Sequence, residues 1–535
     1  MAVLTTLTIL SLVAGFVYAL LTVGHRDPRY PPGPPTLPFI GNLHQLPTKH
    51  IYLKLTEFAK IYGGLYTLKF GTGTVAVITD RRIVRELLDR KSSTSSARPA
   101  SYITQKIISD GDHLLTVPYG QYWRTARRTI HQHFMESMCE HHDRIQHAEA
   151  VQMLRDFVFE PEKYMLHPKR FSNSTITSIL YGVRSPSYES TQLKLLYEIM
   201  DHFTTVMEPG AMPPVDIYPW LKYIPERFLR NWVSRATQVK HEMHFLYESF
   251  LQHIIRRREE QGSKDSFLDK ILDNNGKPNF THNQMRFVGG NIMEAGSDTT
   301  ANVLTAFIQA VTKWPRVQRK AQEEIDAKIG EDRTPNWADY SSLPYVAAIV
   351  KETMRWRPVT PLGIPHALDE DEWVDGKLLP KGTTLIMNTW GLHHDEKQFA
   401  NPDVFNPDRY AGKTLSAAEY AISPDYENRD HYGYGAGRRL CVGIHLAERN
   451  LFLAMSMLLW AFNFEKEIDL VTKKPLEPDI SPLTGYHEGI VTSAKPFPCK
   501  VTLRSEARRE TILREFEDVE VEILSKYETS IHLGK

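Results

Sequence analysis

The residues with the clearest chemical potential lie in a glycine-rich loop around Cys441. The loop reads YGAGRRLCVG over residues 434–443, and an apolar stretch typical of a helix follows it. A helix N-terminus presents backbone N–H groups and the positive end of the helix dipole, and both stabilise a thiolate. The small residues let the backbone pass close to a flat group, and Arg439 can reach an anion on that group. The loop therefore suits a haem whose iron is bound by the Cys441 thiolate, with a buried structural cysteine as the alternative.

A second candidate site lies inside a long helix that begins at a capping box over residues 281–284 and ends near Pro315. Its centre reads EAGSDTT over residues 294–300. Glycine costs about 1 kcal/mol there relative to alanine, and Ser, Asp and Thr compete for backbone groups. We expect a local widening of the helix that exposes the Thr299 hydroxyl beside the Asp298 carboxylate. A buried acid next to an alcohol can deliver protons stepwise, whereas a surface turn between two helices is the alternative.

Two further patterns supply charged or donor side chains. Glu352 and Arg355 lie on one helix face, and the block FNPDRY follows at residues 405–410. Trp123 and Arg127 place an indole N–H and a guanidinium on about one helix face, which suits a carboxylate of a cofactor. On their own, such pairs are ordinarily solvated surface contacts.

These patterns together resemble the signatures of the cytochrome P450 family. The loop at 434–443 is similar to the family's cysteine loop, with Tyr434 in place of the usual Phe. The string at 295–300 is similar to its oxygen-activation motif at every position. Four motifs occur in the family's order over roughly residues 30–505. The resemblance implies a mainly α fold with a minor β part, the cytochrome P450 fold.

The resemblance also implies which residues hold the cofactor. Cys441 would be the axial metal ligand of the iron in heme b. Arg439, Trp123, Arg127 and His366 would be further cofactor-binding residues that contact the haem propionates.

The remaining motif residues receive catalytic and structural roles from the same resemblance. Thr299 would donate a hydrogen bond during oxygen activation, and Asp298 would relay protons. Glu352, Arg355 and Arg409 would form a buried structural triad, in which each charge depends on its partners. This triad would lock the segment that leads to the cysteine loop.

The implied reaction is that of a monooxygenase. It splits O2, inserts one oxygen atom into a small hydrophobic substrate and releases the other as water. Electrons would come from NADPH through NADPH-cytochrome P450 reductase, a separate chain, because no flavin or dinucleotide motif is present here. The strings at 363–366 and 209–219 look like filamentous-fungal monooxygenases of secondary metabolism, such as the O-methylsterigmatocystin oxidoreductase group.

Two other functions remain open from the sequence. The same haem chemistry could couple two phenols oxidatively without inserting oxygen. A non-catalytic haem-binding protein is the alternative from another class, and the Asp298–Thr299 pair argues against it because a passive haem needs no proton relay.

Composition excludes several classes of protein. The 535 residues carry 64 Lys+Arg and 64 Asp+Glu, so the formal net charge is zero and nothing indicates a nucleic-acid-binding surface. Cys139, Cys441 and Cys499 are few and widely spaced, which argues against a disulfide framework or a zinc site and favours a reducing compartment.

The N-terminal segment is expected to be a membrane anchor. Residues 2–23 carry no charge, and Arg26 and Arg29 follow them. The length and the charges after the run predict one transmembrane helix in the endoplasmic reticulum membrane, with the catalytic domain on the cytosolic side. A cleaved signal peptide, which normally has a basic start, and a buried helix are the alternatives.

No linker divides the rest of the chain. We predict a membrane anchor over 1–24, a proline-rich hinge over 25–36, a haem-thiolate monooxygenase domain over 37–505 and a charged C-terminal helical extension over 506–535. Strand-like patterns predict a hairpin over 65–78 and further strands over 378–388 and 488–503.

Overall fold

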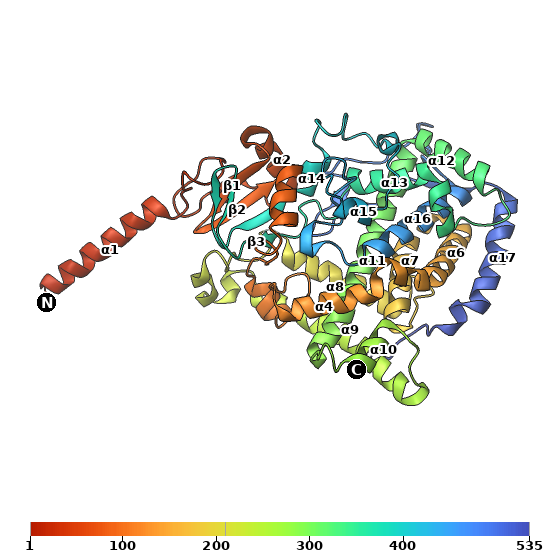
Figure 1. Ribbon diagram of the computed structural model, residues 1–535, viewed down its shortest axis with the longest axis horizontal. Coiled ribbons are helices and arrows are strands. Elements are labelled where there is room, and N and C mark those ends of the chain that lie inside the picture. The colour runs from red at the N-terminus through yellow and green to blue at the C-terminus, as the bar shows by residue number, and fades with distance from the viewer. Residues whose placement is uncertain (1, 209, 534–535) are drawn as a thin grey trace.

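The computed structural model describes residues 2–208 and 210–533 and is mainly helical (Figure 1). This confirms the expected fold class. The α-helices are α1 Ala2–Thr22, α2 Ile51–Tyr62, α3 Arg81–Val84, α4 Gln121–Phe134, α5 Glu136–Cys139, α6 Asp143–Phe159, α7 His167–Tyr181, α8 Thr191–Met207, α9 Trp232–Gln261, α10 Phe267–Asn274, α11 His282–Lys313, α12 Pro315–Lys328, α13 Pro344–Trp356, α14 Thr389–His393, α15 Ala417–Ile422, α16 Ile444–Ala461 and α17 Glu506–Glu522.

The β part is small and lies mostly at the end of the molecule nearest α1 (Figure 1). The strands are β1 Leu65–Phe70, β2 Gly73–Ile78, β3 His366–Ala367, β4 Glu372–Val374, β5 Lys377–Leu379, β6 Thr384–Met387, β7 Phe462–Glu465, β8 Tyr486–His487, β9 Ser493–Ala494 and β10 Lys500–Leu503. The largest sheet has the order β1-β2-β6-β3. Its β1–β2 pair is antiparallel with Leu65 opposite Ile78, which confirms the predicted hairpin.

Helix α11 runs through the helical body and organises it. The predicted capping box is present: Thr281 Oγ1 accepts the Gln284 N–H, and Gln284 Oε1 accepts the Thr281 N–H, both at 3.2 Å. The helix packs against α7, α9 and α16, and it is apolar on most sides because neighbours surround it.

The expected local widening of α11 is wrong, because the helix is continuous from His282–Lys313. Extra donors satisfy its central carbonyls without opening it: Ala295 O accepts from Thr299 Oγ1 at 2.7 Å, Gly296 O from Ser172 Oγ at 2.6 Å and Ser297 O from the Tyr197 hydroxyl at 3.2 Å. Gly296 is needed for packing, since a Cβ there would lie 2.6 Å from Ile176 of α7. Close helix contact therefore explains the glycine that the sequence alone marks as a weak point.

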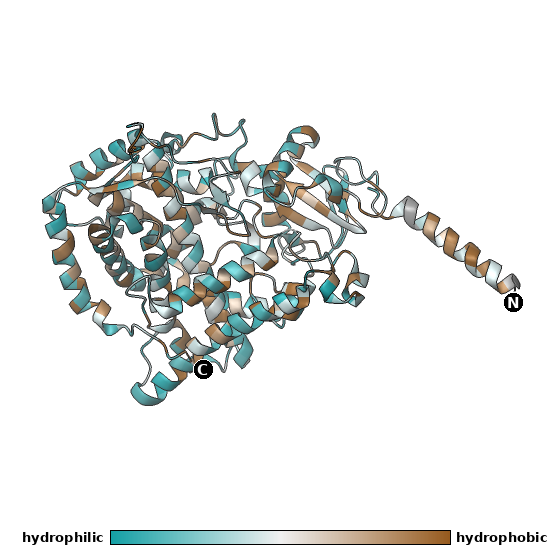
Figure 2. Ribbon diagram, turned by 180° about the vertical axis from the view of Figure 1, so that it is seen from behind, coloured by the Kyte–Doolittle hydropathy of each residue, from teal (hydrophilic) through white to brown (hydrophobic). Residues whose placement is uncertain are grey.

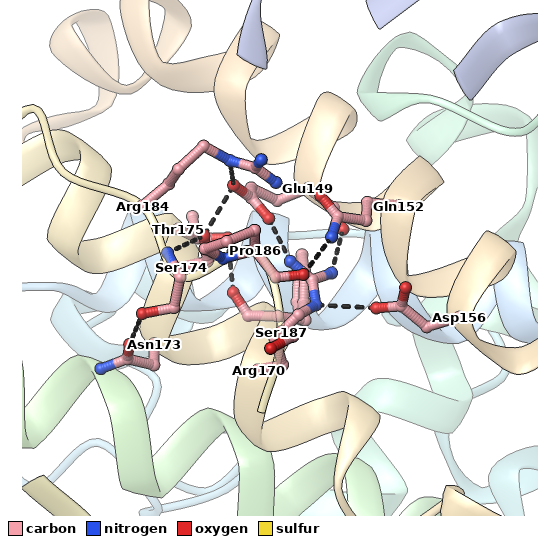
Figure 3. Close-up of polar contacts among 12 residues, drawn as sticks. Glu149, Gln152, Asp156, Arg170, Asn173, Ser174, Thr175, Arg184, Pro186 and Ser187 are labelled. Atoms are coloured by element: carbon pink, nitrogen blue, oxygen red, sulfur yellow. Dashed lines mark hydrogen bonds and ion pairs between the residues drawn. The ribbon is translucent and has the colours of Figure 1, made fainter. Parts of the chain in front are cut away.

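A buried ion network joins α6 to α7 behind this helix (Figure 3). The carboxylate of Glu149 accepts hydrogen bonds from Arg170, from Arg184 Nε at 3.0 Å and from Ser174 Oγ at 2.7 Å. Burial alone would raise the pKa of Glu149, but the two guanidiniums outweigh burial and lower it. Asp156 completes the network at 2.9 Å from Arg170 Nε.

Helix α1 projects from the sheet end of the body (Figures 1 and 2). Apolar side chains along it, among them Leu4, Leu12 and Tyr18, are exposed. However, none of the helices in the described part of the chain combines the length and apolar character needed to cross a membrane. The predicted transmembrane helix over 1–24 is therefore not supported.

The proline-rich segment over 25–36 lies along β1. Arg26 donates hydrogen bonds to the carbonyls of Gly33, Pro34 and Thr67 at 2.8–2.9 Å. The Thr67 N–H in turn donates to Pro32 O at 2.8 Å. The segment is thus fastened to the catalytic body, and the domain boundaries at residues 24, 36 and 505 stay predictions.

The C-terminal extension forms α17, which lies along the outer edge of the molecule against α6 (Figure 1). Its predicted apolar face contributes Ile512 and Phe516 to the main core. Arg508 pairs with Asp326 at 2.8 Å. Beyond α17, the Arg184 N–H donates to Glu528 O at 2.7 Å, so the extension reaches the buried ion network.

Candidate functional site

The helical body holds a cavity of about 420 Å³ between α11, α4, α8 and the segment before α16. Seven residues predicted to bind the cofactor or to catalyse line this cavity: Cys441, Arg439, Trp123, Arg127, His366, Thr299 and Asp298. They come from segments separated by up to about 300 residues, so tertiary packing alone brings them together. The other two cysteines, Cys139 and Cys499, are buried and do not line it.

The loop that presents Cys441 is shaped by two left-handed glycines. Gly435 and Gly437 have φ of 82° and 62°. A Cβ on Gly437 would lie only 1.8 Å from Leu88 O, so this glycine allows the backbone to approach another backbone segment. The sequence predicts that the loop glycines make room for a flat group, but for Gly437 the neighbour is instead protein. The Cys441 N–H donates to Tyr434 O at 2.9 Å, which closes the loop and leaves the side chain exposed to the cavity.

The surroundings of Cys441 raise the pKa of its thiol. Burial raises its pKa, while the Gly443 N–H and the guanidinium of Arg127 act in the opposite direction. Helix α16 begins at Ile444, directly after this loop, as the sequence predicted. The loop and α4 together therefore direct a sulfur atom, a backbone N–H group and a cation toward the same space.

Three arginines line the cavity without an acidic partner among the described residues. Arg439 donates to the carbonyls of Ser96 and Val117 at 2.9 Å, and burial together with Arg98 and Arg127 lowers its pKa to about 9. Burial lowers the pKa of Arg98 to about 10. The Arg127 side chain makes no hydrogen bond or ion pair with the described residues, and burial lowers its pKa as well. Clustered, buried cations of this kind call for an anionic ligand.

Arg98 is a site residue that the sequence analysis missed. It donates Nε to Leu115 O at 2.9 Å and Nη1 to the carbonyls of Ile364 and Pro365 at 2.7–2.8 Å. It therefore ties together the loop before α4 and the segment before β3. The only signal in the sequence was an isolated arginine in the polar string SSARPAS, which has no motif spacing.

Trp123 and His366 stand beside these arginines. The Arg439 guanidinium lies 4.2 Å from the centre of the Trp123 ring, so the indole supports the arginine through a cation–π contact. His366 Nδ1 lies 2.8 Å from Ser95 O, and burial with Arg98 and Arg439 lowers its pKa to about 3. With its Nδ1–H donated to that carbonyl, the ring can donate Nε2–H to an anion only when it is protonated.

Asp298 and Thr299 lie next to each other on the cavity face of α11. Burial raises the pKa of Asp298 to about 6, although Lys169 and a 3.0 Å hydrogen bond from Asn302 act against it. The Thr299 hydroxyl donates to Ala295 O at 2.7 Å. An acid that can gain or lose a proton near neutral pH thus adjoins a hydroxyl that faces the cavity.

The structure also brings Glu352, Arg355 and Arg409 together outside the cavity. Arg355 donates to both carboxylate oxygens of Glu352 at 2.7 and 2.8 Å, and Arg409 Nε lies 3.3 Å from Glu352 Oε1. Glu352 and Arg355 are fully buried. Arg355 also donates to His393 O at 2.9 Å, and His393 Nε2 accepts the Tyr432 N–H at 2.8 Å. This chain of contacts connects the triad to the backbone that leads into the Cys441 loop.

The cavity residues fit a haem. An exposed thiol, three guanidiniums without carboxylate partners and a mostly apolar wall match the iron, the two propionates and the flat apolar ring of that cofactor. The apolar wall includes Ile130, Val303 and Leu446.

Comparisons with known proteins agree with this geometry. The sequence profile described as Cytochrome P450 matches residues 31–485. The chain is 52% identical over 530 residues to cytochrome P450 monooxygenase macC of Penicillium terrestre, covering 98% of this chain and 99% of that protein. It is 50% identical to cytochrome P450 monooxygenase yanC of Aspergillus niger, covering 98% of each. It is 48% identical to cytochrome P450 monooxygenase patH of Aspergillus clavatus, covering 98% of this chain and 99% of that protein.

These matches confirm the predicted fungal resemblance as well as the fold. The profile and the near full-length relatives lead to one identification. The chain belongs to the cytochrome P450 family, whose cofactor is a haem iron bound by a cysteine thiolate.

Proposed function

We propose that this cytochrome P450 monooxygenase binds heme b through Cys441 and oxidises a small hydrophobic substrate of fungal secondary metabolism. The observation that carries the proposal is the shared cavity, in which one exposed cysteine, clustered arginines and the Asp298–Thr299 pair face the same space. The fungal relatives, each named a cytochrome P450 monooxygenase, support the reaction type.

Each cavity residue has a proposed task. When bound, the haem supplies the activation of O2 and the oxidation of the substrate. Cys441 holds the iron, while Arg98, Arg127 and Arg439 neutralise the propionates, with Trp123 and His366 beside them.

Asp298 and Thr299, which line the cavity from α11, move and hold protons. The pKa of about 6 lets Asp298 exchange a proton near neutral pH. The Thr299 hydroxyl can accept a hydrogen bond from the cavity, and it can donate into the cavity when it releases Ala295 O. The buried triad of Glu352, Arg355 and Arg409 fixes the cysteine loop without touching the reactants.

Electrons come, in this proposal, from NADPH through a separate NADPH-cytochrome P450 reductase. We also propose attachment to the endoplasmic reticulum membrane, with the catalytic body on the cytosolic side. The support is α1, in which the apolar side chains of Leu7, Leu10 and Phe16 are each more than half exposed. The proposal is attachment through this helix and does not require that α1 crosses the bilayer.

The test is the absorption spectrum of the reduced, CO-bound protein. The wild type should show the strongly red-shifted band of a thiolate-bound haem, and Cys441→Ala should abolish it. Cys499→Ala is the matched control, because that cysteine is buried, does not line the cavity and contacts Thr312 at 3.3 Å. Loss of the band in the Cys499 variant, or its retention in the Cys441 variant, would refute the assignment. Isotopically labelled O2 in the product would then separate oxygen insertion from phenol coupling.

A further inference from the structure

The C-terminal segment, residues 524–533 after α17, lies outside the cavity and has no part in the proposed haem chemistry. It returns to the body beside the end of α7 and pairs with the loop there. The Glu528 N–H donates to Gly182 O at 3.1 Å, and the Arg184 N–H donates to Glu528 O at 2.7 Å. Leu524 is buried in the main core. The segment is therefore held in a fixed position on the body.

The C-terminal segment also joins the start of α8 to the end of α9. Gln192 of α8 donates its Nε2–H to Thr529 O at 3.2 Å. The Glu528 carboxylate pairs with His253 of α9, and its other oxygen lies 2.8 Å from Lys264 Nζ in the loop after α9. Burial acts to raise the pKa of Glu528, but the hydrogen bonds from Lys264 and His253 outweigh burial and lower it. The carboxylate is therefore charged near neutral pH and binds α9 as an anion.

Helices α8 and α9 form an antiparallel hairpin on one side of the cavity. His202 of α8 pairs with Glu242 of α9 at 2.8 Å, and the start of α8 faces the end of α9 across the C-terminal segment. Helix α8 packs mainly on α9, and its Met200 and Phe203 line the cavity. A movement of α9 therefore carries α8, and with it part of the cavity wall.

Helix α9 crosses α11 at Gly290, where a Cβ would lie 2.5 Å from the ring of Tyr247. The glycine lets this ring rest directly on the α11 backbone, so the crossing can act as a pivot. At 1.5 Å per residue, the long arm of α9 from Tyr247 to Trp232 measures about 22 Å, and the short arm from Tyr247 to His253 measures about 9 Å. A movement of the short arm therefore becomes about 2.5-fold larger at the end of the long arm.

The long arm of α9 and the loop before it rest on the segment that leads into the cavity wall. Asp216 Oδ1, in that loop, accepts the Tyr102 N–H at 2.8 Å. Lys240 Nζ of the long arm lies 2.7 Å from Asp110 Oδ1. Only a few residues further along the chain, Leu114 lines the cavity. These contacts separate when the long arm lifts, and their separation opens this side of the cavity.

We infer that the C-terminal segment is a clamp on the short arm of α9, and that the Glu528 carboxylate sets how often the α8–α9 hairpin lifts to open the cavity. While Glu528 holds His253 and Lys264, the short arm stays on the body and the long arm stays closed. Loss of these ion pairs frees the short arm, although the backbone hydrogen bonds of residue 528 keep the segment in place. The inference goes beyond the proposed function, because it concerns entry to the cavity and not the reaction inside it.

Hydrogen–deuterium exchange of the full-length holoenzyme tests the clamp directly. The Tyr102 N–H is bonded to Asp216 only while the hairpin is closed, so its exchange rate reports how often the hairpin lifts. Glu528→Gln removes the charge from both ion pairs and retains the backbone hydrogen bonds. We expect the Tyr102 amide to exchange about fivefold faster in this variant, the scale of one well-formed, partly exposed ion pair.

Glu522→Gln is the matched control. Glu522 belongs to the same extension, but its partner Arg144 is on α6, so the pair does not touch the hairpin. This variant should leave the exchange of the Tyr102 amide unchanged. His253→Gln should raise that exchange, and the double variant with Glu528→Gln should match Glu528→Gln alone, because both changes act through one contact.

Ligand entry provides the second measurement. Stopped-flow absorbance gives the association rate constants of 4-phenylimidazole with the ferric holoenzyme and of CO with the reduced holoenzyme. The aromatic probe needs a wide opening, whereas CO passes through a much narrower one. Glu528→Gln should therefore raise the rate constant for 4-phenylimidazole about fivefold and that for CO less than about twofold.

The outcomes separate the clamp from the proposed function. Unchanged Tyr102 exchange in Glu528→Gln, or an equal increase in Glu522→Gln, overturns the clamp. An increase spread equally over α6 and α16 shows a loss of overall stability and overturns it as well. Faster exchange without faster entry of 4-phenylimidazole overturns the control of access. A wild type without the thiolate-haem band overturns the proposed function instead, and the exchange measurement still decides the clamp.

Discussion

At the scale of single residues, the sharpest prediction concerns how Thr299 and Asp298 affect turnover and the use of NADPH. Thr299→Ala should retain haem and substrate affinity but divert NADPH into hydrogen peroxide, because a proton donor in the cavity is lost. Asp298→Asn should slow turnover by about 10²–10⁴-fold, since the relay itself is interrupted. Product formed per NADPH and peroxide released are the measurements.

Thr305→Ala is the control for this pair. Thr305 lies on the same helix and makes the same kind of hydrogen bond, to Ala301 O at 2.9 Å, but it does not line the cavity. Its variant should couple NADPH to product like the wild type. If Thr299→Ala did so as well, α11 would have no part in proton delivery.

The raised pKa of Asp156 predicts how the free energy of unfolding depends on pH. Burial raises its pKa in the folded protein to about 6, above its ordinary value of 3.8. The folded state therefore holds the proton more tightly, and the free energy of unfolding falls as pH rises from about 4 to about 6. This separation corresponds to about 3 kcal/mol at most. Asp156→Asn should remove this fall in the free energy of unfolding. The melting temperature of the variant, relative to that of the wild type, should therefore rise between about pH 4 and about pH 6. An unchanged difference between the two curves would contradict the assignment.

Much of the site could be predicted at this scale, and the misses have physical causes. Cys441, Asp298 and Thr299 belong to short strings whose chemistry is local, and the structure places all three on one cavity. Arg98 was missed because all its partners are backbone carbonyls, two of them more than 250 residues away, which no local pattern reveals. Gly437 was assigned a wrong neighbour, since only the fold shows Leu88 beside it.

At the scale of elements, the triad fastens α13 to the segment before the cysteine loop. Arg355→Ala leaves the fully buried Glu352 with Arg409 as its remaining charged partner, which should cost about 3–5 kcal/mol. We expect little haem-loaded protein, measured as the ratio of haem absorbance to protein. The exposed pair of Arg316 with Asp408 offers a control, since Arg316→Ala should cost less than about 1 kcal/mol. A stable, haem-replete Arg355 variant would mean that the triad is dispensable.

The elements also show which structural features the sequence could predict and which it could not. Helix α11 and the β1–β2 hairpin were predicted because capping boxes and alternating patterns are local signals. The continuity of α11 was not, since hydroxyls from α7 and α8 satisfy its central carbonyls. Such donors come from other elements and leave no trace in the helix's own sequence.

At the scale of the whole molecule, the catalytic body should be separable from α1. A variant that starts at Val23 keeps the contact of Val23 O with the Phe39 N–H and all contacts of Arg26. It should bind haem like the full chain and lose most of its co-sedimentation with phospholipid vesicles. Equal co-sedimentation of both proteins would place membrane attachment elsewhere. A shorter variant that starts at Pro31 lacks Arg26 and should be less stable.

The contact between Arg184 and Glu528 also sets an order of events during synthesis. Arg184 belongs to the ion network around Glu149, yet its backbone N–H pairs with a residue close to the end of the chain. At about 5–20 residues per second, the ribosome needs on the order of 20–70 s to proceed from one to the other. During that time the Arg184 N–H, in the loop after α7, lacks its acceptor, Glu528 O. The Arg184 N–H therefore gains its partner only after the segment around Glu528 has been synthesised.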